Sequence, residues 1–535
     1  MSFSSPFPEV DIPTASVFDY LFDGIDDATL DRVALVDAKT RRHTTYREMI
    51  GRIDTFAGAL AARGVGVGDV VGLLAPNSSA FAIAFHGILR CGATATTINA
   101  LFTGKDVAKQ LRDAKARMLI TVTPLLAAAK EGAAQAGISD EDLVVLDGGG
   151  RDVDGHPNAE ELLAGAPAAP RVDFAPSTHL AVLPYSSGTT GNPKGVMLTH
   201  RNLVANVAQI RPLHGMQPDD VVLAVLPFFH IYGMTVLLNA AVHARAQLVI
   251  MPSFDLAEFL GNIAEHRCTI AFIAPPVAVA LAKHPLVDDY DLSSLKVVMS
   301  GAAPLDADLG HAVAQRLGCK VVQGYGMSEL SPVSHITPFD GGRVNMLIEA
   351  PLSSVGWTVS NAASKIVDPE TGDEIDPPAE GLSKTGELWF KGPNVMAGYL
   401  NNEEATNATI DAQGWLHTGD LAQVDANGCV YIVDRLKELI KYKGYQVPPA
   451  ELEAVLLTHP QIADAAVVGV PDDDGEEVPK AFVVTQPGSE LTAEEVIEFV
   501  AGQVAPYKKV RRVAFIDAVP KSAAGKILRK DLRSQ

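Results

Sequence analysis

Short apolar runs that alternate with amphipathic stretches through the middle of the chain constrain its fold more than any other feature of the sequence. The runs that resemble buried strands are residues 180–183, 221–226, 247–251, 271–273 and 296–299. Stretches with helical periodicity lie between them, for example at 255–267 and 306–317. Because strand and helix alternate, the sequence predicts an α/β architecture with largely parallel sheets.

The pattern changes near Asp434. Beyond that residue the order becomes helix, strand, strand, helix, strand, helix, and Thr492 and Glu495 form a capping box at the start of the second helix. At 535 residues the chain is also too long for one ordinary domain. The sequence therefore predicts a second α+β domain of about 100 residues that begins near Asp434.

The charge of the chain argues against a large binding surface for nucleic acid or anionic membranes. The sequence has 43 Lys and Arg against 64 Asp and Glu, a net charge of -21, and its 47% hydrophobic residues can form a sizeable core. Residues 505–535 differ, because they hold nine basic and two acidic residues, net +7. A basic end on an acidic protein suggests a small anionic ligand.

The sequence indicates a cytoplasmic protein without a transmembrane segment. Its four cysteines form no C-x-x-C pair, which fits neither a zinc cluster nor a disulfide framework. The N-terminus carries Glu9 and Asp11 and does not resemble a signal peptide. The most apolar region, 221–251, is interrupted by proline, glycine and charged residues, so it cannot form an unbroken span of about 20 residues.

The strongest local signal is the segment 185–195, Tyr-Ser-Ser-Gly-Thr-Thr-Gly-Asn-Pro-Lys-Gly, between a predicted strand and a predicted helix. Glycines let backbone N–H groups turn toward an anion, hydroxyls add donors, and lysine supplies charge, so the segment suits a polyphosphate. The alternative is a flexible Ser/Gly/Thr loop. The candidate phosphate-binding residues are Ser186, Ser187, Gly188, Thr189, Thr190, Gly191 and Lys194.

This segment resembles the signature of the adenylate-forming superfamily, which includes acyl-CoA synthetases, peptide-synthetase adenylation domains and firefly luciferase. Further motifs follow in the order that the family has them, at 227–230, 324–329, 415–420, 434–437, 440–444 and 520–526. The resemblance covers nearly the whole chain. It identifies an AMP-forming acyl-CoA ligase as the expected enzyme.

The resemblance also implies the fold and the reaction. Residues 1–433 should form a large N-terminal adenylation domain of parallel-rich sheets flanked by helices, with a smaller β subdomain, and residues 434–535 a small mobile α+β domain. ATP and a carboxylic acid should give an acyl-adenylate and pyrophosphate, after which the thiol of CoA displaces AMP. Because the two steps need different groups at one carbonyl, the small domain should rotate about a hinge near 434–437.

Several motif residues are expected to hold the nucleotide. Glu329 is a carboxylate on a glycine-rich turn, the hard oxygen ligand that Mg²⁺ prefers, although a solvated turn acid is the alternative. Asp420 can accept from ribose hydroxyls and Arg435 can donate to the sugar or a phosphate; otherwise they form one more surface ion pair. The resemblance adds Gly324, Tyr325, Gly326, Met327, Ser328 and Lys437 to the ATP site.

Three basic side chains are candidates for catalysis. Lys526 can stabilise the charge between the carboxylate and the α-phosphate, whereas a lysine near a terminus is usually a solvated surface residue. Lys441 lies on a possible edge strand and, by resemblance, serves the second half-reaction together with Lys443, Gly444 and Gln446, which should lie near CoA. His230 should gate the acyl site, although a histidine in an apolar run is more often a core residue.

The nearest resemblance is to 4-coumarate–CoA ligases, which implies a slot for a flat aryl acid such as 4-coumarate or cinnamate. Those ligases use a small residue in place of Val236, so the slot here should differ in shape. No Asp follows His230 to pair with an ammonium group, which disfavours amino acids. The expected pocket residues are Ile231, Tyr232, Val236, Met299, Ala302, Gly324, Gly326, Pro332 and Val333.

Three other readings of the sequence stay open. The acid could be a medium-chain fatty acid, the acceptor could be a separate carrier protein, or the adenylate could feed a luciferase-like oxygenase. The expected cofactors are ATP, Mg²⁺ and CoA as co-substrate, and the expected partner is a small carboxylic acid.

Overall fold

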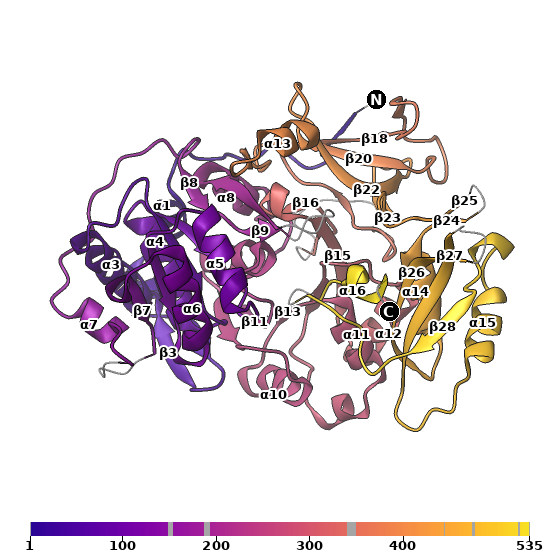
Figure 1. Ribbon diagram of the computed structural model, residues 1–535, viewed down its shortest axis with the longest axis horizontal. Helices are drawn as coiled ribbons and strands as arrows, with labels where there is room; N and C mark the ends of the chain where they lie inside the picture. Colours follow the sequence, from indigo (N-terminus) through magenta and orange to yellow (C-terminus); the bar gives the residue numbers. More distant parts are fainter. Residues whose placement is uncertain are drawn as a thin grey trace.

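Three sheets form the large N-terminal part of the protein, and a smaller group of strands and helices follows it (Figure 1). The computed structural model describes residues 2–147, 153–186, 193–339, 349–442, 445–472, 477–522 and 525–533. Of the predicted site residues, Ser187, Gly188, Thr189, Thr190, Gly191, Lys443 and Gly444 lie outside these ranges.

A nine-stranded sheet contains all the predicted strands from residue 221 onward in the middle of the chain. Its strands are, in spatial order, β17 (Trp357–Thr358), β16 (Val333–Ile336), β15 (Lys320–Gly326), β14 (Val297–Ser300), β13 (Ile270–Ile273), β11 (Val221–Ala224), β12 (Gln247–Ile250), β2 (Val33–Asp37) and β3 (Arg42–Thr45). The run from β15 to β2 is parallel, as the alternation of strand and helix predicts.

An eight-stranded sheet carries the strand before the predicted phosphate segment and the strand after it. Its path is β21 (Gly398–Tyr399), β10 (Lys194–Thr199), β8 (Leu180–Val182), β5 (Thr94–Thr97), β4 (Val70–Leu74), β6 (Met118–Thr121) and β7 (Leu143–Val145), and β9 (Tyr185–Ser186) pairs with β10. The pairing of β21 with β10 joins segments about 200 residues apart in sequence.

A third, antiparallel sheet forms a smaller β subdomain, as predicted. It consists of β1 (Phe3–Ser4), β18 (Ala363–Val367), β20 (Gly386–Lys391), β22 (Leu416–Val424) and β23 (Val430–Arg435), with β19 (Glu374–Ile375) paired to β18. Phe3 pairs with Ser364, so the start of the chain lies beside a strand that comes much later. The N-terminus is therefore marked beside the orange β strands in Figure 1.

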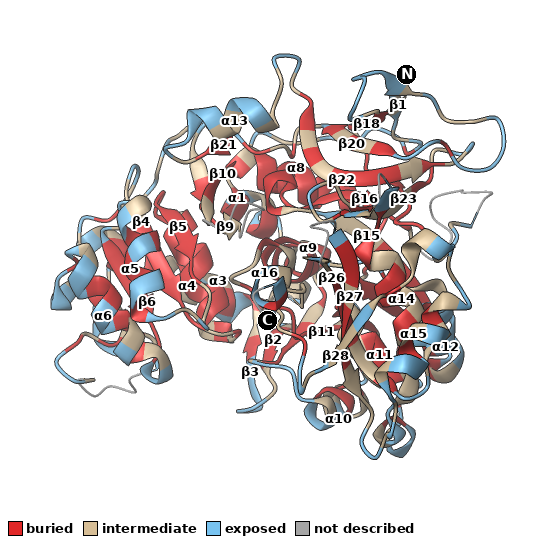
Figure 2. Ribbon diagram, turned by 45° about the vertical axis from the view of Figure 1, so that its right-hand side comes forward, coloured by how far each residue is buried: buried red, intermediate tan, exposed pale blue. Residues whose placement is uncertain are grey.

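Helices cover both faces of the two large sheets, and their apolar faces define the layers. One core lies between the sheets around α1, α3, α4 and α8; α5 and α6 cover the outer face of the eight-stranded sheet, and α10 to α12 that of the nine-stranded sheet. Figure 2 shows the strands largely buried and α13 at the surface. The predicted α/β fold class is confirmed.

The two amphipathic stretches predicted at 255–267 and 306–317 are helices, as is the segment that follows the predicted phosphate loop, and further helices complete the large part. The helices of this part are α1 (Val17–Phe22), α2 (Asp27–Leu30), α3 (Tyr46–Ala62), α4 (Ser79–Arg90), α5 (Gly104–Asp113), α6 (Leu126–Ala136), α7 (Ala159–Leu163), α8 (His200–Ile210), α9 (Ala240–Ala244), α10 (Leu256–His266), α11 (Pro275–Lys283), α12 (Ala307–Leu317) and α13 (Glu403–Thr409). A π-helix, η3, spans Tyr232–Asn239. Short 3₁₀ helices are η1 (Thr123–Leu125), η2 (Asp140–Asp142), η4 (Pro285–Asp289) and η5 (Ser328–Leu330).

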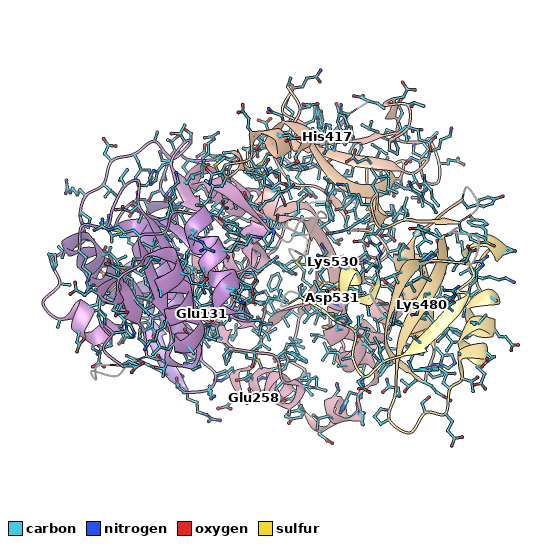
Figure 3. The ribbon with its side chains drawn as sticks, in the orientation of Figure 1. Glu131, Glu258, His417, Lys480, Lys530 and Asp531 are labelled. Carbon is cyan, nitrogen blue, oxygen red and sulfur yellow. The ribbon has the colours of Figure 1, made fainter. Side chains whose placement is uncertain are left out.

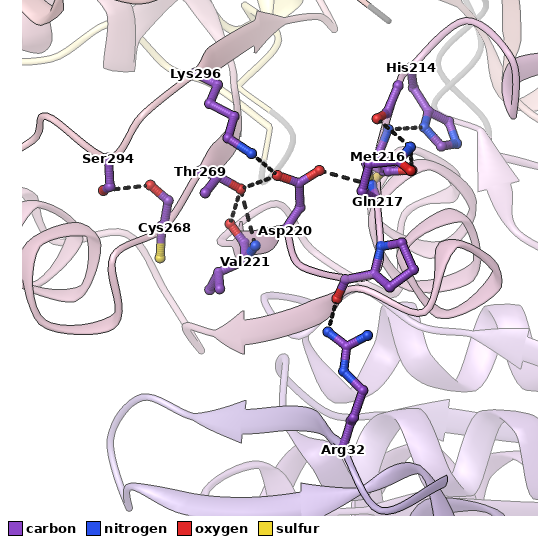
Figure 4. Close-up of polar contacts among 12 residues, drawn as sticks. Arg32, His214, Met216, Gln217, Asp220, Val221, Cys268, Thr269, Ser294 and Lys296 are labelled. Atoms are coloured by element: carbon purple, nitrogen blue, oxygen red, sulfur yellow. Dashed lines mark hydrogen bonds and ion pairs between the residues drawn. The ribbon is translucent and has the colours of Figure 1, made fainter. Parts of the chain in front are cut away.

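The amino ends of the parallel strands in the nine-stranded sheet are tied together by one buried carboxylate (Figure 4). Asp220, just before β11, accepts from the Thr269 hydroxyl at 2.9 Å and pairs with Lys296 Nζ at 2.8 Å. These two residues precede β13 and β14. The opposite edge, where the strands end, is thus the one left for ligands, as is usual in open α/β sheets.

The C-terminal part has its own core. Strands β26 (Ile462–Pro471), β27 (Glu477–Thr485) and β28 (Arg512–Phe515) form one sheet, and β24 (Ile440–Tyr442) and β25 (Tyr445–Val447) form a hairpin. The helices are α14 (Pro449–Thr458), α15 (Ala493–Ala501), η6 (Pro506–Lys508) and α16 (Arg529–Arg533). The predicted capping box of Thr492 and Glu495 is present, and from α14 onward the helices and strands follow the predicted order, with the β24–β25 hairpin before them.

One lysine joins the two parts of the molecule. Lys283, the last residue of α11, donates from Nζ to the carbonyl oxygens of Leu457 at 2.8 Å and His459 at 3.4 Å, at the C-terminal end of α14. Burial lowers the pKa of Lys283. In the described part of the chain, no helix is both long and apolar enough to cross a membrane.

Candidate active site

The predicted substrate and nucleotide residues follow the carboxyl ends of β14 and β15. Met299 lies near the end of β14, and the motif 324–329 runs from the last residues of β15 into η5. Neighbouring parallel strands end at the same edge of a sheet, so these residues come together there.

The turn that carries Glu329 is held by buried side-chain amides. Asn206 on α8 accepts from the Val333 N–H at 3.0 Å and donates to the Val333 carbonyl at 2.7 Å. Asn394 donates to the carbonyl of Leu330 at 2.7 Å. Both amides are fully buried, so the turn has one fixed geometry.

Glu329, Tyr399 and Lys194 form a chain of contacts at this turn. The Tyr399 hydroxyl donates to Glu329 Oε1 at 2.8 Å, and the Lys194 ammonium lies 4.7 Å from the centre of the Tyr399 ring. Glu329 is only 5% exposed. The structure therefore brings together the predicted metal ligand and the predicted phosphate lysine.

Tyr399 was missed by sequence reasoning, although it lies at the centre of this cluster. It is the last residue of β21, which pairs with β10, the strand that begins at Lys194. No local pattern around Tyr399 signals that pairing. Burial and the neighbouring Glu329 carboxylate raise the pKa of Tyr399 well above the ordinary value.

Ser186 is the residue of the predicted phosphate segment that precedes the undescribed stretch. Its hydroxyl is buried and has no hydrogen-bond partner among the described residues. A buried hydroxyl without a partner is costly, so an acceptor from a ligand would satisfy it. This orphaned group fits the expected phosphate site.

The predicted ribose residues are adjacent across two strands. Asp420 on β22 is opposite Arg435 on β23, with Arg435 Nε 3.5 Å from Asp420 Oδ1. The Tyr325 hydroxyl donates to Asp420 Oδ2 at 2.5 Å, and the pKa of Tyr325 is raised well above its ordinary value by burial and by Asp420. The motifs at 324–329, 415–420 and 434–437 therefore meet at this point.

Lys526 reaches this group from the C-terminal part. Burial lowers the pKa of Lys526 to about 8, Arg435 acts in the same direction, and Asp420 and Glu438 oppose the shift. Helix α16, whose Lys530 and Asp531 are labelled near the centre of Figure 3, begins three residues later. The structure thus holds Lys526 beside the predicted ribose residues.

His230 also lies close to Lys526. Burial lowers the pKa of His230 to about 4, and the positive charge of Lys526 adds to the effect, so the imidazole is neutral at pH 7. Asn77 fixes the preceding segment, because its side chain donates to the Leu226 carbonyl at 2.9 Å and accepts from the Phe228 N–H at 2.7 Å.

Of the residues expected to serve CoA, Lys441 lies on β24 and Gln446 on β25, whereas Lys443 and Gly444 lie outside the described residues. The side chain of Lys441 is exposed, and its backbone N–H donates to Glu477 Oε2 at 2.8 Å. Gln446 on the other strand is exposed, and so is Lys437 just before the hairpin. In this arrangement Lys526, whose pKa responds to the charges of the ribose residues, and Lys441 lie on different elements of the C-terminal part.

The predicted acyl residues line up along η3 and the strand ends beside it. Ile231 and Val236 are buried, and the Tyr232 ring meets Phe272 edge-on with centroids 6.4 Å apart. A Cβ placed on Gly301, between Met299 and Ala302, would lie 2.7 Å from the Tyr232 hydroxyl. That hydroxyl is buried and has no hydrogen-bond partner in the described part of the chain.

The other wall of the predicted slot consists of closely packed backbone. A Cβ on Gly326 would lie 2.1 Å from the Pro332 carbonyl oxygen, so only glycine fits there, whereas a Cβ on Gly324 would come no closer than 3.4 Å to the His335 carbonyl. Val333, after Pro332, is 8% exposed.

Comparison with known proteins identifies the family. The AMP-binding enzyme family matches residues 25–400, and the AMP-binding enzyme C-terminal domain matches residues 451–526. The chain belongs to the AMP-binding enzymes. This membership confirms the predicted adenylate-forming superfamily.

One relative shows a similarity that extends over the full length of the chain. A protein named 4-coumarate–CoA ligase 3 from Oryza sativa subsp. japonica is 43% identical over 100% of this chain and 94% of its own length. This likeness confirms the predicted resemblance to 4-coumarate–CoA ligases.

Solved structures support the fold and the arrangement of its parts. The anthranilate CoA ligase AuaEII in complex with anthranoyl-AMP superposes with a TM-score of 0.87 at 27% identity, over 98% of both chains. ATP-bound MatB from Rhodopseudomonas palustris gives 0.85 at 29% identity over 98% of this chain and 99% of its own, whereas apo MatB gives 0.75. The chain thus superposes better on the ATP-bound structure of MatB than on the apo structure.

Proposed function

We propose that this enzyme is an ATP-dependent acid–CoA ligase that activates aryl-propenoic acids such as 4-coumarate. The observation that carries the proposal is the position of Lys526, which comes from the C-terminal part and lies near enough to Asp420 and His230 of the large part, and to Arg435 at the expected hinge, for their charges to influence one another. The full-length likeness to 4-coumarate–CoA ligases supports the acid and the acceptor.

In the first half-reaction a carboxylate oxygen of the acid attacks the α-phosphorus of ATP. A P–O bond forms, the bond to pyrophosphate breaks, and an acyl-adenylate remains. Asp420 accepts hydrogen bonds from the ribose, Arg435 donates beside it, and Lys194 and the Ser186 hydroxyl face the phosphates. The Lys526 ammonium stabilises the charge that builds up between the two reactants.

The residues present also fit the expected Mg²⁺. Among the described residues there is no group of three or more His, Cys, Asp or Glu side chains that could hold a metal. A single buried carboxylate, Glu329, suits Mg²⁺, which is usually bound by one or two carboxylates together with nucleotide phosphates. When bound, the ion would neutralise phosphate charge.

In the second half-reaction the CoA thiol loses its proton to water, its sulfur forms a C–S bond with the acyl carbon, and AMP leaves with the bonding electrons of the C–O bond. Lys526 has no role in that step. We expect the C-terminal part to rotate about 434–437 so that Lys441, with Lys443, Gly444 and Gln446, replaces it. Residues 1–433 and 434–535 are then the two rigid units.

The acyl slot supports an aryl acid with a polar para substituent. Tyr232 and Met299 provide apolar surface, and the unpartnered Tyr232 hydroxyl would be satisfied by a phenolic group on the ring. A site built to hydrogen-bond a substrate hydroxyl discriminates strongly against an analogue that lacks it.

A pyrophosphate-release screen over cinnamates, benzoates and fatty acids, with and without CoA, tests the proposal. We expect release with 4-coumarate and cinnamate and a CoA thioester when CoA is present. Fatty acids that outcompete every aromatic acid would contradict the substrate class. An adenylate that forms but never reaches CoA would point to a carrier protein as acceptor.

A further inference from the structure

We propose that two ion pairs inside the C-terminal part, Arg529–Glu453 and Lys521–Asp464, position the Lys526 ammonium for adenylate formation. The four residues act through Lys526 and do not touch the reactants. The inference rests on the proposed role of Lys526 in the first half-reaction and adds residues that hold it there.

Lys526 lies on a short turn between the two pairs. The Ser522 N–H donates to the Lys526 carbonyl at 2.8 Å, and the Lys526 N–H donates to the Ser522 hydroxyl at 3.2 Å. Lys521 and Ile527 form an antiparallel bridge at the base of the turn. The orientation of Lys526 therefore depends on where the two arms of the turn are fixed.

The arm after Lys526 is fixed by a buried pair. Arg529 NH2 lies 2.8 Å and 2.7 Å from the two carboxylate oxygens of Glu453, and Arg529 Nε donates to the Val467 carbonyl at 3.2 Å. Both side chains are 11% exposed. Glu453 also accepts from the Val467 N–H at 2.8 Å, so the arm is tied to both α14 and β26.

The arm before Lys526 is fixed by the second pair. Lys521 Nζ lies 2.5 Å from Asp464 Oδ2 on β26, with the two side chains 17% and 27% exposed. The elements that carry the two carboxylates, α14 and β26, share one apolar core, and Leu532 anchors α16 in a second apolar cluster on the other face of β26. The turn is clamped to the C-terminal part at each end.

The burial of these two ion pairs is better explained by a role in positioning Lys526 than by a contribution to the stability of the fold. Desolvation offsets most of the attraction in a buried ion pair, and apolar residues of similar size are often as stabilising. A catalytic charge, in contrast, must be held within about 0.5 Å of its productive place. The two pairs lie wholly inside the C-terminal part, so they move with it when it rotates.

The test compares two half-reactions in variants of the stronger pair. Acid-dependent ATP–pyrophosphate exchange measures adenylation, and thioester formation from supplied acyl-adenylate and CoA measures the second step. Glu453→Gln and Arg529→Met should lower kcat for exchange roughly 10- to 100-fold, as small misplacements of catalytic groups do, with KM for ATP unchanged. Thioester formation should stay within about twofold of the wild type.

The chain offers a matched control and a rescue. Glu451 lies two residues before Glu453 on α14 and pairs with Lys508 at 2.6 Å, away from the Lys526 turn, so Glu451→Gln should leave both half-reactions unchanged. Arg529→Lys keeps the charge and should recover part of the exchange activity lost in Arg529→Met. Asp464→Asn, on the more exposed arm, repeats the test with less risk to folding.

Three outcomes would overturn the proposal. Folded Glu453→Gln and Asp464→Asn enzymes with normal exchange would show that the pairs do not position Lys526. Equal losses in both half-reactions would assign the pairs a structural role only. If Lys526→Ala exchanges normally, the proposed role of Lys526 fails, and the positioning inference fails with it.

Discussion

At the scale of single residues, the environment of Lys526 sets the pH range in which the enzyme can form the adenylate. A buried ammonium beside Arg435 loses its proton more easily than a free lysine, and its pKa of about 8 lies just above neutral pH. The group must be protonated to stabilise developing negative charge. Charged Lys526 is thus present below about pH 8 and lost above it.

We therefore expect kcat/KM for pyrophosphate release to fall as the pH rises through about 8, since this ratio reports the free enzyme. Lys526→Ala should lower adenylation by roughly 10²- to 10³-fold. Lys526→Arg should be slower than the wild type, but because arginine stays protonated its kcat/KM should no longer fall on the alkaline limb of the pH profile, above about pH 8. An unchanged limb in that variant would assign the limb to another group.

The unpartnered hydroxyl of Tyr232 gives a second prediction. If it binds a phenolic group on the substrate, Tyr232→Phe removes a hydrogen bond in a buried site, which costs about 1–3 kcal/mol. We therefore expect kcat/KM for 4-coumarate to fall roughly 5- to 150-fold. Cinnamate, which has no such group, should be affected little. Competition between the two acids measures the ratio directly, and equal losses for both would contradict this role.

Val236 should set the width of the same slot. Val236→Ala removes two methyl groups from a side chain that is 2% exposed, so ring-substituted cinnamates should gain over cinnamate. A methylene-sized change is worth about 1–3 kcal/mol, so the ratio should shift roughly 10- to 200-fold. An unchanged ranking of acids would show that Val236 does not face the ring.

At the scale of elements, the site depends on a turn and a π-helix that local patterns do not reveal. Helices and strands with clear periodicity, such as α12 and β14, could be predicted because burial imposes the period directly. The π-helix Tyr232–Asn239 could not, since its apolar residues follow neither period. Tyr399 could not be assigned because its contact with Glu329 arises from a pairing between distant strands.

The turn after Glu329 can be tested through Asn394. Asn394→Ala leaves the buried Leu330 carbonyl without its partner and should lower the free energy of unfolding by about 1–3 kcal/mol. The displaced turn should also raise KM for ATP. Gln110, an equally buried amide that donates to the Thr97 carbonyl at 3.0 Å, provides the control: Gln110→Ala should reduce stability alone, as denaturant unfolding and ATP titration can show.

At the scale of the whole molecule, Lys283 helps to hold the C-terminal part in the orientation that presents Lys526. A cation at the C-terminal end of α14 interacts favourably with the helix dipole and its last carbonyls. The same contact must break if the C-terminal part rotates. The strength of this one contact therefore influences the balance between the two half-reactions.

Lys283→Met should lower ATP–pyrophosphate exchange roughly 2- to 10-fold, the effect of one cation at a helix terminus, without slowing thioester formation from supplied adenylate. Lys296→Met removes a comparable lysine from the same large part, where its partner is Asp220, and should change neither step. A loss confined to thioester formation would show that the contact belongs to the other orientation.

The pairing of β1 with β18 has a consequence for the order of synthesis. Phe3 and Ser4 leave the ribosome long before their partners Ser364 and Ala363. Strand β1 therefore stays unpaired until β18 has been synthesised, and the antiparallel sheet can be completed only after that. The entropy of loop closure grows only slowly with loop length, so the large sequence separation of β1 and β18 lowers the free energy of unfolding little. Its main effect is on the rate of folding.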